Sequence, residues 1–485
     1  MNKKKFFFFL IILLSFYIIF NTFFFGNKKF FGEIKNLIQN EQKIIIKKYL
    51  FPYKYISELE ILIELQQKEI DSKIVTLRDL RLQLNERDKF LSNLLDIKGS
   101  SNFYQTKTNV LKLKNNEYKL IEFEQDYLKI KKHGHAKNGS VYIEKVNDNI
   151  ILLSADGKFQ YFKIEDLKNK NFSAQLINSN IKDLIKYEKF YSNSNYGIKD
   201  LFFDNNFIYF SFNREVKNEC FNTSILRANI NYQKLIFEKF FFPEECVLST
   251  EEWFTPHSAG GRMVKYKDKI IFSNGEYLSR HLAQDDKSIF GKILMLDPLK
   301  PNQFKIISKG HRNIQGLYVD QENQVILSTE HGPMGGDEVN VNTEFEKNIL
   351  NFGWPISSYG EHYGYKERID SHKIYKIAPL YKSHSKYGFV EPIKYFVPSI
   401  GISEIVKFHD YNSEEKTFLF GSLGNDPLEG DMSLHIIILD KKYKTLLDHH
   451  AINIGGRVRD IINLGDSNYL LSLETSSTLG FLTGL

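Results

Sequence analysis

Six copies of one strand pattern dominate the sequence beyond residue 130. Each copy has a glycine-led strand that is half apolar, a turn rich in polar residues, and a strongly apolar strand that ends in a small residue. In chain order the copies are GSVYIEKVNDNIILLS, GIKDLFFDNNFIYFS, GRMVKYKDKIIFS, GLYVDQENQVILS, GISEIVKFHDYNSEEKTFLFGS and GRVRDIINLGDSNYLLS. Repetition on this scale predicts a fold built from one small sheet used several times.

The interval between copies selects the architecture. The second strands start at Ile150, Phe207, Ile270, Val325, Phe418 and Tyr469, so the steps are 57, 63, 55, 93 and 51 residues. Such a period, with several short strands in each repeat, is typical of a β-propeller, whose radial sheets leave few exposed edges. We expect an all-β, six-bladed β-propeller over residues 101–485, with a long excursion at 342–398. A β-sandwich or a run of separate small β domains is the alternative.

The last copy lacks one strand. It offers only GRVRDII, YLLSLE and LGFL, whereas the stretch YKLIEFEQDYLKI at residues 118–130 precedes the first copy. This N-terminal strand is expected to pair with the last blade, which would close the ring and cover an open sheet edge.

A long apolar stretch lies at the N-terminus. Behind Lys3, Lys4 and Lys5, residues 6–25 hold no charge and three polar side chains, and they have about the length needed to cross a membrane as a helix. Aromatic rather than small residues end the stretch, which favours an uncleaved signal anchor over residues 1–26. The lysine-dense tail predicts a single-pass inner-membrane protein with its bulk in the periplasm or outside the cell.

Residues 27–100 are predicted to form a helical stalk. Branched apolar residues recur every seven positions, at Ile56, Ile63, Ile70, Leu77, Leu84 and Leu91. This spacing is typical of a helix that packs along a partner in a coiled coil. The partner is either another subunit, which would make a homo-oligomer, or the body of the same chain.

Charge and cysteine content exclude several classes of protein. The chain has 65 Lys and Arg against 59 Asp and Glu, and because these charges are scattered we expect no nucleic-acid partner. Two cysteines are too few for a four-thiolate zinc site. In an oxidising compartment Cys220 and Cys246 would form a disulfide, and the alternative is two separate thiols.

Polar residues gather in the loops that enter the predicted innermost strands. These segments are PHSAGGR, GHRNIQG and GGRVRD, together with EHGPMGGDEVN after the second strand of the fourth copy. In a propeller such loops meet at the central channel. Taken singly, each residue has a structural explanation, since an isolated histidine or a paired arginine is more often satisfied within the fold.

Several ordered motifs resemble the glucose and sorbosone dehydrogenases, six-bladed propellers that use pyrroloquinoline quinone (PQQ) and calcium to oxidise sugars. The similarity covers about residues 130–485 and is carried by AQDDKSIFGKILMLDP, GHRNIQGL, STEHGPMGGDEVN, NFGWP and GGRVRDI. It implies a membrane-anchored periplasmic quinoprotein dehydrogenase that oxidises an aldose or a related sugar alcohol and passes electrons to an external acceptor.

The resemblance also implies roles for individual residues. His257 matches the base that takes the hydroxyl proton from the sugar while hydride passes to PQQ. The carbonyl oxygens of Gly332 and Pro333 match the ligands of the cofactor's calcium, and Asp337 and Glu338 fall where relatives hold a structural calcium. Positions that match cofactor-binding residues are Arg312, which also serves the reaction, Asn313, Arg457 and Arg459.

Three departures from the family pattern favour a second interpretation. His257 lies five residues before Arg262, where the family has four. The segment GSLGNDPLE has no lysine where sugar-oxidising relatives carry one, and in NGEY only Glu276 keeps the usual carboxylate. The alternative function is therefore a non-catalytic propeller that binds a protein or a glycan and stands on a coiled-coil stalk.

Overall fold

A computed structural model describes residues 11–12, 14–18, 59–80, 83, 99–114, 116–125, 141–251, 254–333, 335–360, 383–474 and 478–485. The chain divides into two compact units, Met1–Lys89 and Phe90–Leu485. Each unit is described by itself.

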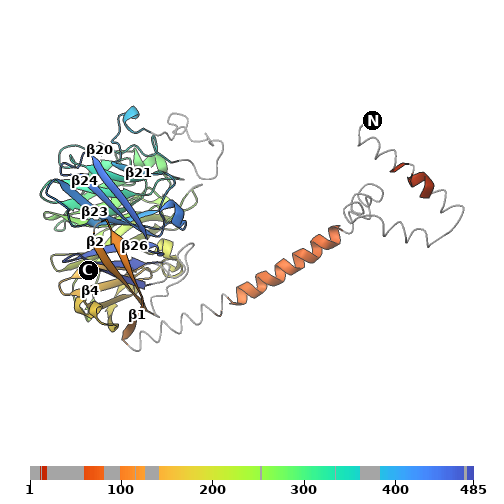
Figure 1. Cartoon of the computed structure of the whole chain (residues 1–485), viewed down its shortest axis with the longest axis horizontal. Helices are drawn as coiled ribbons and strands as arrows, with labels where there is room; N and C mark the ends of the chain where they lie inside the picture. The colour runs from red at the N-terminus through yellow and green to blue at the C-terminus, as the bar shows by residue number, and fades with distance from the viewer. Residues whose placement is uncertain are drawn as a thin grey trace. The chain divides into compact units, whose positions relative to one another are not determined.

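In the N-terminal unit, residues 59–80 form one helix whose side chains are all exposed (Figure 1). The exposed residues include Ile63, Ile70 and Leu77 of the seven-residue pattern. Most of the predicted anchor at 1–26 and much of the predicted stalk at 27–100 lie outside the described residues. No helix within the described part of the chain combines the length and the apolar character that a membrane crossing requires. The anchor and the coiled coil stay predictions.

The second unit is built from six four-stranded antiparallel blades. Blade 1 contains β3 (Val141–Val146), β4 (Asn149–Ser154), β5 (Phe159–Lys163) and β6 (Asn171–Ser179), and blade 2 contains β7 (Ile198–Asp204), β8 (Phe207–Lys217), β9 (Cys220–Asn229) and β11 (Glu238–Phe241). Blade 3 contains β13 (Gly260–Tyr266), β14 (Lys269–Asn274), β15 (Lys292–Leu296) and β16 (Phe304–Lys309), and blade 4 contains β17 (Ile314–Asp320), β18 (Val325–Glu330), β19 (Asp337–Asn342) and β21 (Lys394–Phe396). Blade 5 contains β22 (Ile402–Lys407), β23 (Glu415–Ser422), β24 (Ser433–Asp440) and β25 (Leu446–Asn453), and blade 6 contains β26 (Val458–Gly465), β27 (Asn468–Leu473), β28 (Thr478–Gly484) and β2 (Asn116–Gln125).

Short elements complete the connections. Three strands of two residues each extend the blades: β10 (Lys234–Leu235) pairs with β6, β12 (Val247–Leu248) with β9, and β20 (Leu350–Asn351) with β16. The helices are η1 (Ile164–Lys168), α5 (Ile181–Leu184), α6 (Glu188–Ser192), η2 (Ser194–Tyr196), η3 (Arg280–Ala283), η4 (Ser385–Tyr387) and η5 (Pro427–Glu429). The excursion at 342–398 thus supplies β20 to blade 3 and β21 to blade 4.

The first strands of the blades form a closed ring. β3 contacts β7, and contacts continue from β7 through β13, β17, β22 and β26 back to β3. The second strands are β4, β8, β14, β18, β23 and β27, and each contains the start that the repeat pattern predicts. The prediction of an all-β body with propeller-like sheets is confirmed.

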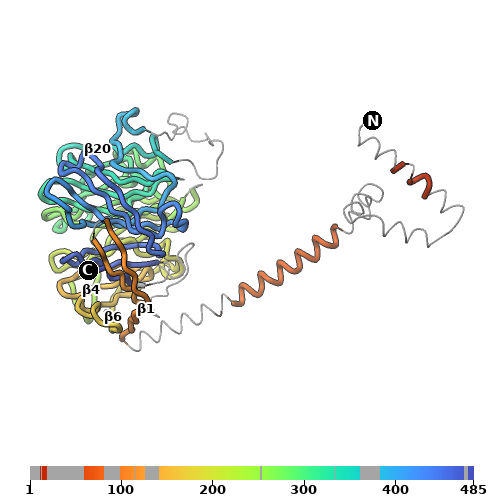
Figure 2. Tube along the Cα trace, in the orientation of Figure 1, coloured from red at the N-terminus to blue at the C-terminus, as the bar shows by residue number. Residues whose placement is uncertain are grey.

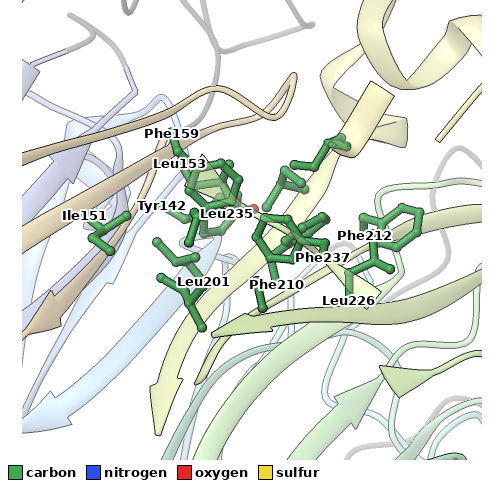
Figure 3. Close-up of a cluster of buried hydrophobic side chains, with 14 of the residues drawn as sticks. Tyr142, Ile151, Leu153, Phe159, Leu201, Phe210, Phe212, Leu226, Leu235 and Phe237 are labelled. Atoms are coloured by element: carbon green, nitrogen blue, oxygen red, sulfur yellow. The ribbon is translucent and has the colours of Figure 1, made fainter. Parts of the chain in front are cut away.

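Apolar side chains fill the gaps between neighbouring blades. Figure 3 shows the cluster between blades 1 and 2, where Phe159 and Phe210 pack with Leu235 and Phe237. Five similar clusters occupy the other gaps around the ring. Since each buried side chain of this size contributes about 1.5–3 kcal/mol, packing between blades holds the ring together.

Strand β2 joins the two ends of the described body. It pairs antiparallel with β28, with Tyr118 opposite Gly484 and Glu124 opposite Thr478, so it lies where the closing strand was expected. A further strand, β1 (Ser100–Leu113), pairs with β2 and also with β6 of blade 1. Blades 6 and 1 therefore form one ten-stranded sheet in which β2 lies between β28 and β1, and Figure 2 shows the orange segments of this region next to the blue C-terminal ones. The repeat pattern did not predict β1.

Cys220 and Cys246 form a disulfide, which is the pairing that the sequence suggested. The bond joins the start of β9 to the residue before β12, and these two strands also pair through Cys220 and Leu248. It therefore fixes the outer part of blade 2.

Candidate functional site

The strand registers place two sets of loops at one end of the ring. Ile314 at the start of β17 pairs with Glu330 at the end of β18, and Gly260 in β13 pairs with Asn274 in β14. Loops before the inner strands and loops after the second strands therefore meet. We call this end the mouth, and it comprises residues 254–260, 274–280, 310–313, 331–333, 335–336, 423–432, 455–457 and 474.

Five of the six inner strands change register close to the mouth. The shifts fall between Ile198 and Asp200, Gly260 and Met263, Ile314 and Gly316, Ile402 and Ile405, and Val458 and Asp460. Such β-bulges leave a residue without a partner and redirect its side chain, and they are frequent beside functional sites. Here they help to bring polar side chains to the ring axis.

A buried ion cluster occupies the centre of the ring. Nη1 of Arg262 lies 2.9 Å from Asp200, 2.8 Å from Glu404 and 2.9 Å from Asp460. Its Nε donates to the carbonyl oxygen of Gln315 at 2.7 Å. Among the described residues, these three carboxylates are the one set close enough together to hold a metal ion, but the guanidinium of Arg262 contacts all three. The cluster is therefore a structural ion network.

Arg312 lies beside the calcium-site loop that the resemblance implies. Its Nη1 donates to the carbonyl oxygen of His331 at 2.9 Å, and its backbone N–H donates to the Glu330 carboxylate. The guanidinium carbon lies 5.5 Å from the centre of the Trp354 ring. Nε of Arg312 is buried and has no hydrogen-bond partner among the described residues, so this side chain has a donor available for a ligand.

A carboxyl group without a hydrogen bond lies next to Arg312. The backbone N–H of Glu276 donates to the carbonyl oxygen of Arg312 at 3.1 Å. Its carboxyl is fully buried, and neither oxygen has a donor at good hydrogen-bond geometry among the described residues. Burial raises the pKa of Glu276 to about 7, while the charges of Arg312 and Arg280 and the nearby N–H groups of Leu278 and Trp354 act in the opposite direction. A buried polar group of this kind indicates a place for water or a ligand.

Asn313 connects three parts of the mouth. Its side-chain oxygen accepts hydrogen bonds from the backbone of Gly260 at 3.1 Å and from Gln315 at 3.0 Å, and its own carbonyl accepts one from His331. The structure thus brings Asn313 and Arg312 together with the loop that holds Gly332. The same bonds tie this loop to the start of β13.

The segment that carries Gly332 and Pro333 is held by hydrogen bonds. Asp337 accepts from the backbone N–H groups of Gly332 at 3.0 Å and Ile402 at 2.9 Å. The hydroxyl of Ser399 donates to the carbonyl oxygen of Pro333 at 3.0 Å. A carbonyl oxygen has a second lone pair, so this contact leaves Pro333 able to bind a cation.

Protein donors already contact both carboxylates for which a structural calcium was suggested. Asp337 anchors the loop as described above, and Glu338 contacts His384 at 3.1 Å and Asn340 at 3.2 Å. Burial raises the pKa of Glu338, and the hydrogen bond from His384 lowers it. This pair therefore has a structural explanation, and its binding of calcium stays a prediction.

Arg457 and Arg459 share one carboxylate within blade 6. Nη2 of Arg457 lies 3.2 Å from Glu474 Oε2, and Nε of Arg459 lies 2.5 Å from Glu474 Oε1. Arg459 also donates to the side chain of Gln315 at 3.0 Å. Glu474, which the motif analysis missed, neutralises part of the charge that a cofactor would contact.

His257 is exposed at the mouth, on a loop whose neighbouring residues Pro256 and Ser258 are buried. The loop packs on the segment that follows β14, because Thr255 N–H donates to the carbonyl oxygen of Tyr277 and Tyr277 N–H donates to that of Ser258. Glu276 precedes Tyr277, so the loop of His257 and the buried carboxyl belong to one hydrogen-bonded group.

The sequence model of the family described as Glucose / Sorbosone dehydrogenase matches residues 182–480. The chain belongs to the glucose/sorbosone dehydrogenase family. It is 28% identical over 244 residues to the aldose sugar dehydrogenase YliI of Escherichia coli strain K12, a match that covers 46% of this chain and 59% of the relative. It is 26% identical over 303 residues to the uncharacterized protein slr1608 of Synechocystis, covering 57% of this chain and 67% of the relative.

A solved structure has the same fold as this family member. The apo form of the soluble aldose sugar dehydrogenase from Escherichia coli superposes with a TM-score of 0.51 at 17% identity, covering 72% of this chain and 96% of that one. At this identity the likeness concerns the fold alone.

Among the mouth residues, Arg312 is best placed to bind an anionic cofactor. Nε of Arg312 is a buried donor without an acceptor among the described residues, which suits a carboxylate. The Gly332 and Pro333 carbonyls follow directly on the carbonyl that Arg312 contacts. The positions of Arg457 and Arg459 also suit an anion, with Glu474 as a competitor for their N–H groups.

Proposed function

We propose that this family member is a quinoprotein dehydrogenase that oxidises an aldose or a related sugar alcohol at the mouth of the ring, with PQQ and calcium. An external acceptor then takes the two electrons. The proposal rests on family membership and on the group of mouth residues, and it concerns the chemical class of the substrate.

Each mouth residue has a defined task in this proposal. Arg312 would hold a carboxylate of the cofactor, and the oxygens of Gly332 and Pro333 would bind the calcium. The quinone, when bound, accepts a hydride from the alcohol carbon, and the calcium makes it a better acceptor. His257 would take the hydroxyl proton, because an imidazole accepts protons near neutral pH. The carboxyl of Glu276 would be a second titratable group close to the loop of His257.

The observation that carries the proposal is the pair of Glu276 and Arg312. Both side chains are buried, and the carboxyl oxygens of Glu276 and Nε of Arg312 have no partner at good hydrogen-bond geometry in the described part of the chain. A folded protein seldom leaves such atoms unsatisfied unless water or a ligand completes the site. Their place beside the 331–333 loop matches the cofactor position of the family resemblance.

The test uses the purified full-length chain, incubated with PQQ and calcium. We expect saturable PQQ binding and reduction of an electron-accepting dye with a panel of aldoses. His257→Ala should abolish turnover and leave PQQ binding within about threefold, since the side chain acts on the substrate proton. Full turnover by this variant would assign the base elsewhere, and a chain that does not bind PQQ would refute the proposed function.

The second candidate is a propeller that binds a protein or glycan without catalysis. The contacts of Arg457 and Arg459 with Glu474 favour it, because paired arginines then serve the fold. This candidate predicts that replacing Glu474 destabilises blade 6 and that PQQ does not bind. Binding of PQQ by the wild-type chain would reject it.

We also propose that the body lies outside the cytoplasm on an uncleaved anchor, with the stalk as a contact between subunits. The disulfide between Cys220 and Cys246 supports an oxidising compartment. Protease digestion of intact spheroplasts tests the placement, since an external body is cut and a cytoplasmic one is protected. Sedimentation of the detergent-solubilised chain tests the oligomer.

A further inference from the structure

Lys199 occupies the bulge of blade 2. Ile198 pairs with Phe212 and Asp200 pairs with Ser211, so Lys199 between them has no partner on β8. The bulges of β17 and β26 leave Gln315 and Arg459 unpaired in the same way. These three residues are therefore equivalent positions around the ring.

Equivalent bulges direct these side chains toward one region. The guanidinium of Arg459 and the side chain of Gln315 are hydrogen bonded at 3.0 Å, although they belong to blades 6 and 4. The charge of Arg459 also acts on the amine of Lys199. Blade 2 thus adds a third polar side chain to the group beside the axis.

The amine of Lys199 has capacity for a further ligand. Within the part of the chain that the structure describes, its Nζ donates to one acceptor, the carbonyl oxygen of Asn195 at 2.6 Å, and no carboxylate lies within salt-bridge distance. Lys292 provides a contrast, because its buried Nζ donates to three carbonyl oxygens at 2.7–3.1 Å. An ammonium has three donors, so those of Lys292 are used within the protein whereas Lys199 retains two.

Two neighbours connect Lys199 with the mouth. A Cβ on Gly261, whose φ is +112°, would lie 2.4 Å from Cβ of Lys199, so this glycine makes room for the lysine side chain. Asn213 donates to the carbonyl oxygens of Asn195 at 2.7 Å and of Pro256 at 3.0 Å. The side chain of Asn213 therefore links the carbonyl oxygen of Asn195, which accepts from Lys199, to the loop of His257.

The electrostatic environment of Lys199 favours an anionic guest. Burial lowers its pKa to about 7, the charge of Arg459 lowers it further, and Glu474 acts in the opposite direction. An ammonium in this setting gains from a nearby negative charge. The residue is half-buried.

We propose that Lys199 is a cofactor-contacting residue, whose ammonium donates hydrogen bonds to a carboxylate of the anionic guest bound at the mouth. This inference rests on the proposed function and deepens it, because it adds a cation from blade 2 to a site supplied by blades 4 and 6. The guest is a small polycarboxylate such as PQQ.

The test measures PQQ binding to the full-length chain by absorbance titration in the presence of calcium. Lys199→Met should weaken binding about tenfold or more, because a charge-assisted hydrogen bond is lost, and Lys199→Arg should restore it to within about threefold. Lys145→Met is the control, since Lys145 lies on β3 and contacts the carbonyl oxygen of Leu464 at 3.0 Å, away from the mouth. Melting temperatures of all variants report on folding.

A second readout uses the wild-type chain, so that it does not depend on a variant that folds. Bound PQQ should reduce acetylation of Lys199 by an activated ester, measured by mass spectrometry, and leave acetylation of Lys145 unchanged. Equal PQQ affinity of the wild type and Lys199→Met, or equal labelling with and without PQQ, would overturn this inference alone. A wild-type chain that does not bind PQQ would overturn the proposed function and this inference with it.

Discussion

The guanidinium of Arg262 connects the inner strands of the ring. It contacts acidic side chains on β7, β22 and β26 and a carbonyl oxygen on β17, and it lies 5.3 Å from the ring of Tyr142 on β3. Three carboxylates around one cation leave an excess of negative charge. The packing at the ring axis is therefore stable only while Arg262 is present and at least one of the three carboxyl groups is protonated.

Arg262→Met tests this dependence. The change leaves the carboxylates of Asp200, Glu404 and Asp460 buried without their cation, so we expect the free energy of unfolding to fall by about 3–5 kcal/mol. Urea denaturation followed by circular dichroism measures it. Lys441→Met is the control, because Lys441 pairs with Glu414 and both side chains are exposed, so the change should cost less than about 1 kcal/mol. Equal losses in the two variants would contradict the argument.

The same cluster predicts how stability varies with pH. Burial raises the pKa of Asp200 to about 7 and that of Glu404 to about 8. The folded chain then binds more protons than the unfolded chain between about pH 4 and pH 8, so the free energy of unfolding falls as the pH rises through this window.

Urea denaturation at pH 6 and pH 8.5 tests the sign. We expect these two carboxyl groups to contribute a loss of about 4 kcal/mol in the wild type and about 1.4 kcal/mol in Glu404→Gln, which removes one of the raised carboxyl groups. A wild-type chain that is more stable at pH 8.5 than at pH 6 would show that the axial carboxylates are ionised at both values.

Single residues also mark the limit of sequence reasoning about the site. The motifs identified Arg312, Asn313 and the 331–333 loop, which the structure brings together. They did not identify Glu474, because this carboxylate, which contacts Arg457 and Arg459, lies directly after β27 and follows no motif. Contacts of this kind depend on register rather than on local spacing.

At the scale of elements, the apolar second strands were predictable and the bulges were not. A strand such as β18 is buried along its whole length, so its run of apolar residues is visible in the sequence. β1 is different, because most of its central residues are exposed and few apolar positions mark it. A bulge leaves no compositional signal, since it changes pairing rather than residue type.

The disulfide of blade 2 leads to a prediction for that element. It closes a loop with a sequence separation of 26 residues between Cys220 and Cys246. Replacing both cysteines by serine should lower the free energy of unfolding by about 3 kcal/mol through loop entropy. Denaturation of the variant and of the wild type, each with and without reductant, measures it. Reductant should destabilise only the wild type, and a variant as stable as the oxidised wild type would contradict the prediction.

For the whole molecule, the ring closes through strands from both ends of the described body. β2 buries Tyr118, Leu120 and Phe123 against blade 6 and its neighbours, and it covers the edge of β28. Without β2 that edge would be open to pairing with other chains. The sequence predicted this closure because the last repeat was one strand short. The additional pairing of β1 with β2 and β6 depends on tertiary contacts alone.

Two truncations separate the ring from the segment that precedes it. A chain without residues 1–98 keeps β1 and β2, so its melting temperature should equal that of the full chain's body. A chain without residues 1–125 loses six buried apolar side chains, Phe103, Leu111 and Leu113 of β1 and Tyr118, Leu120 and Phe123 of β2. Each is worth about 1.5–3 kcal/mol, so their sum reaches the stability of a typical domain. This chain should therefore aggregate or melt at a much lower temperature, and a synthetic peptide of residues 99–125 should raise that temperature by pairing with β28. Identical melting of the two truncated chains would mean that blade 6 is stable with three strands and that ring closure does not depend on β2.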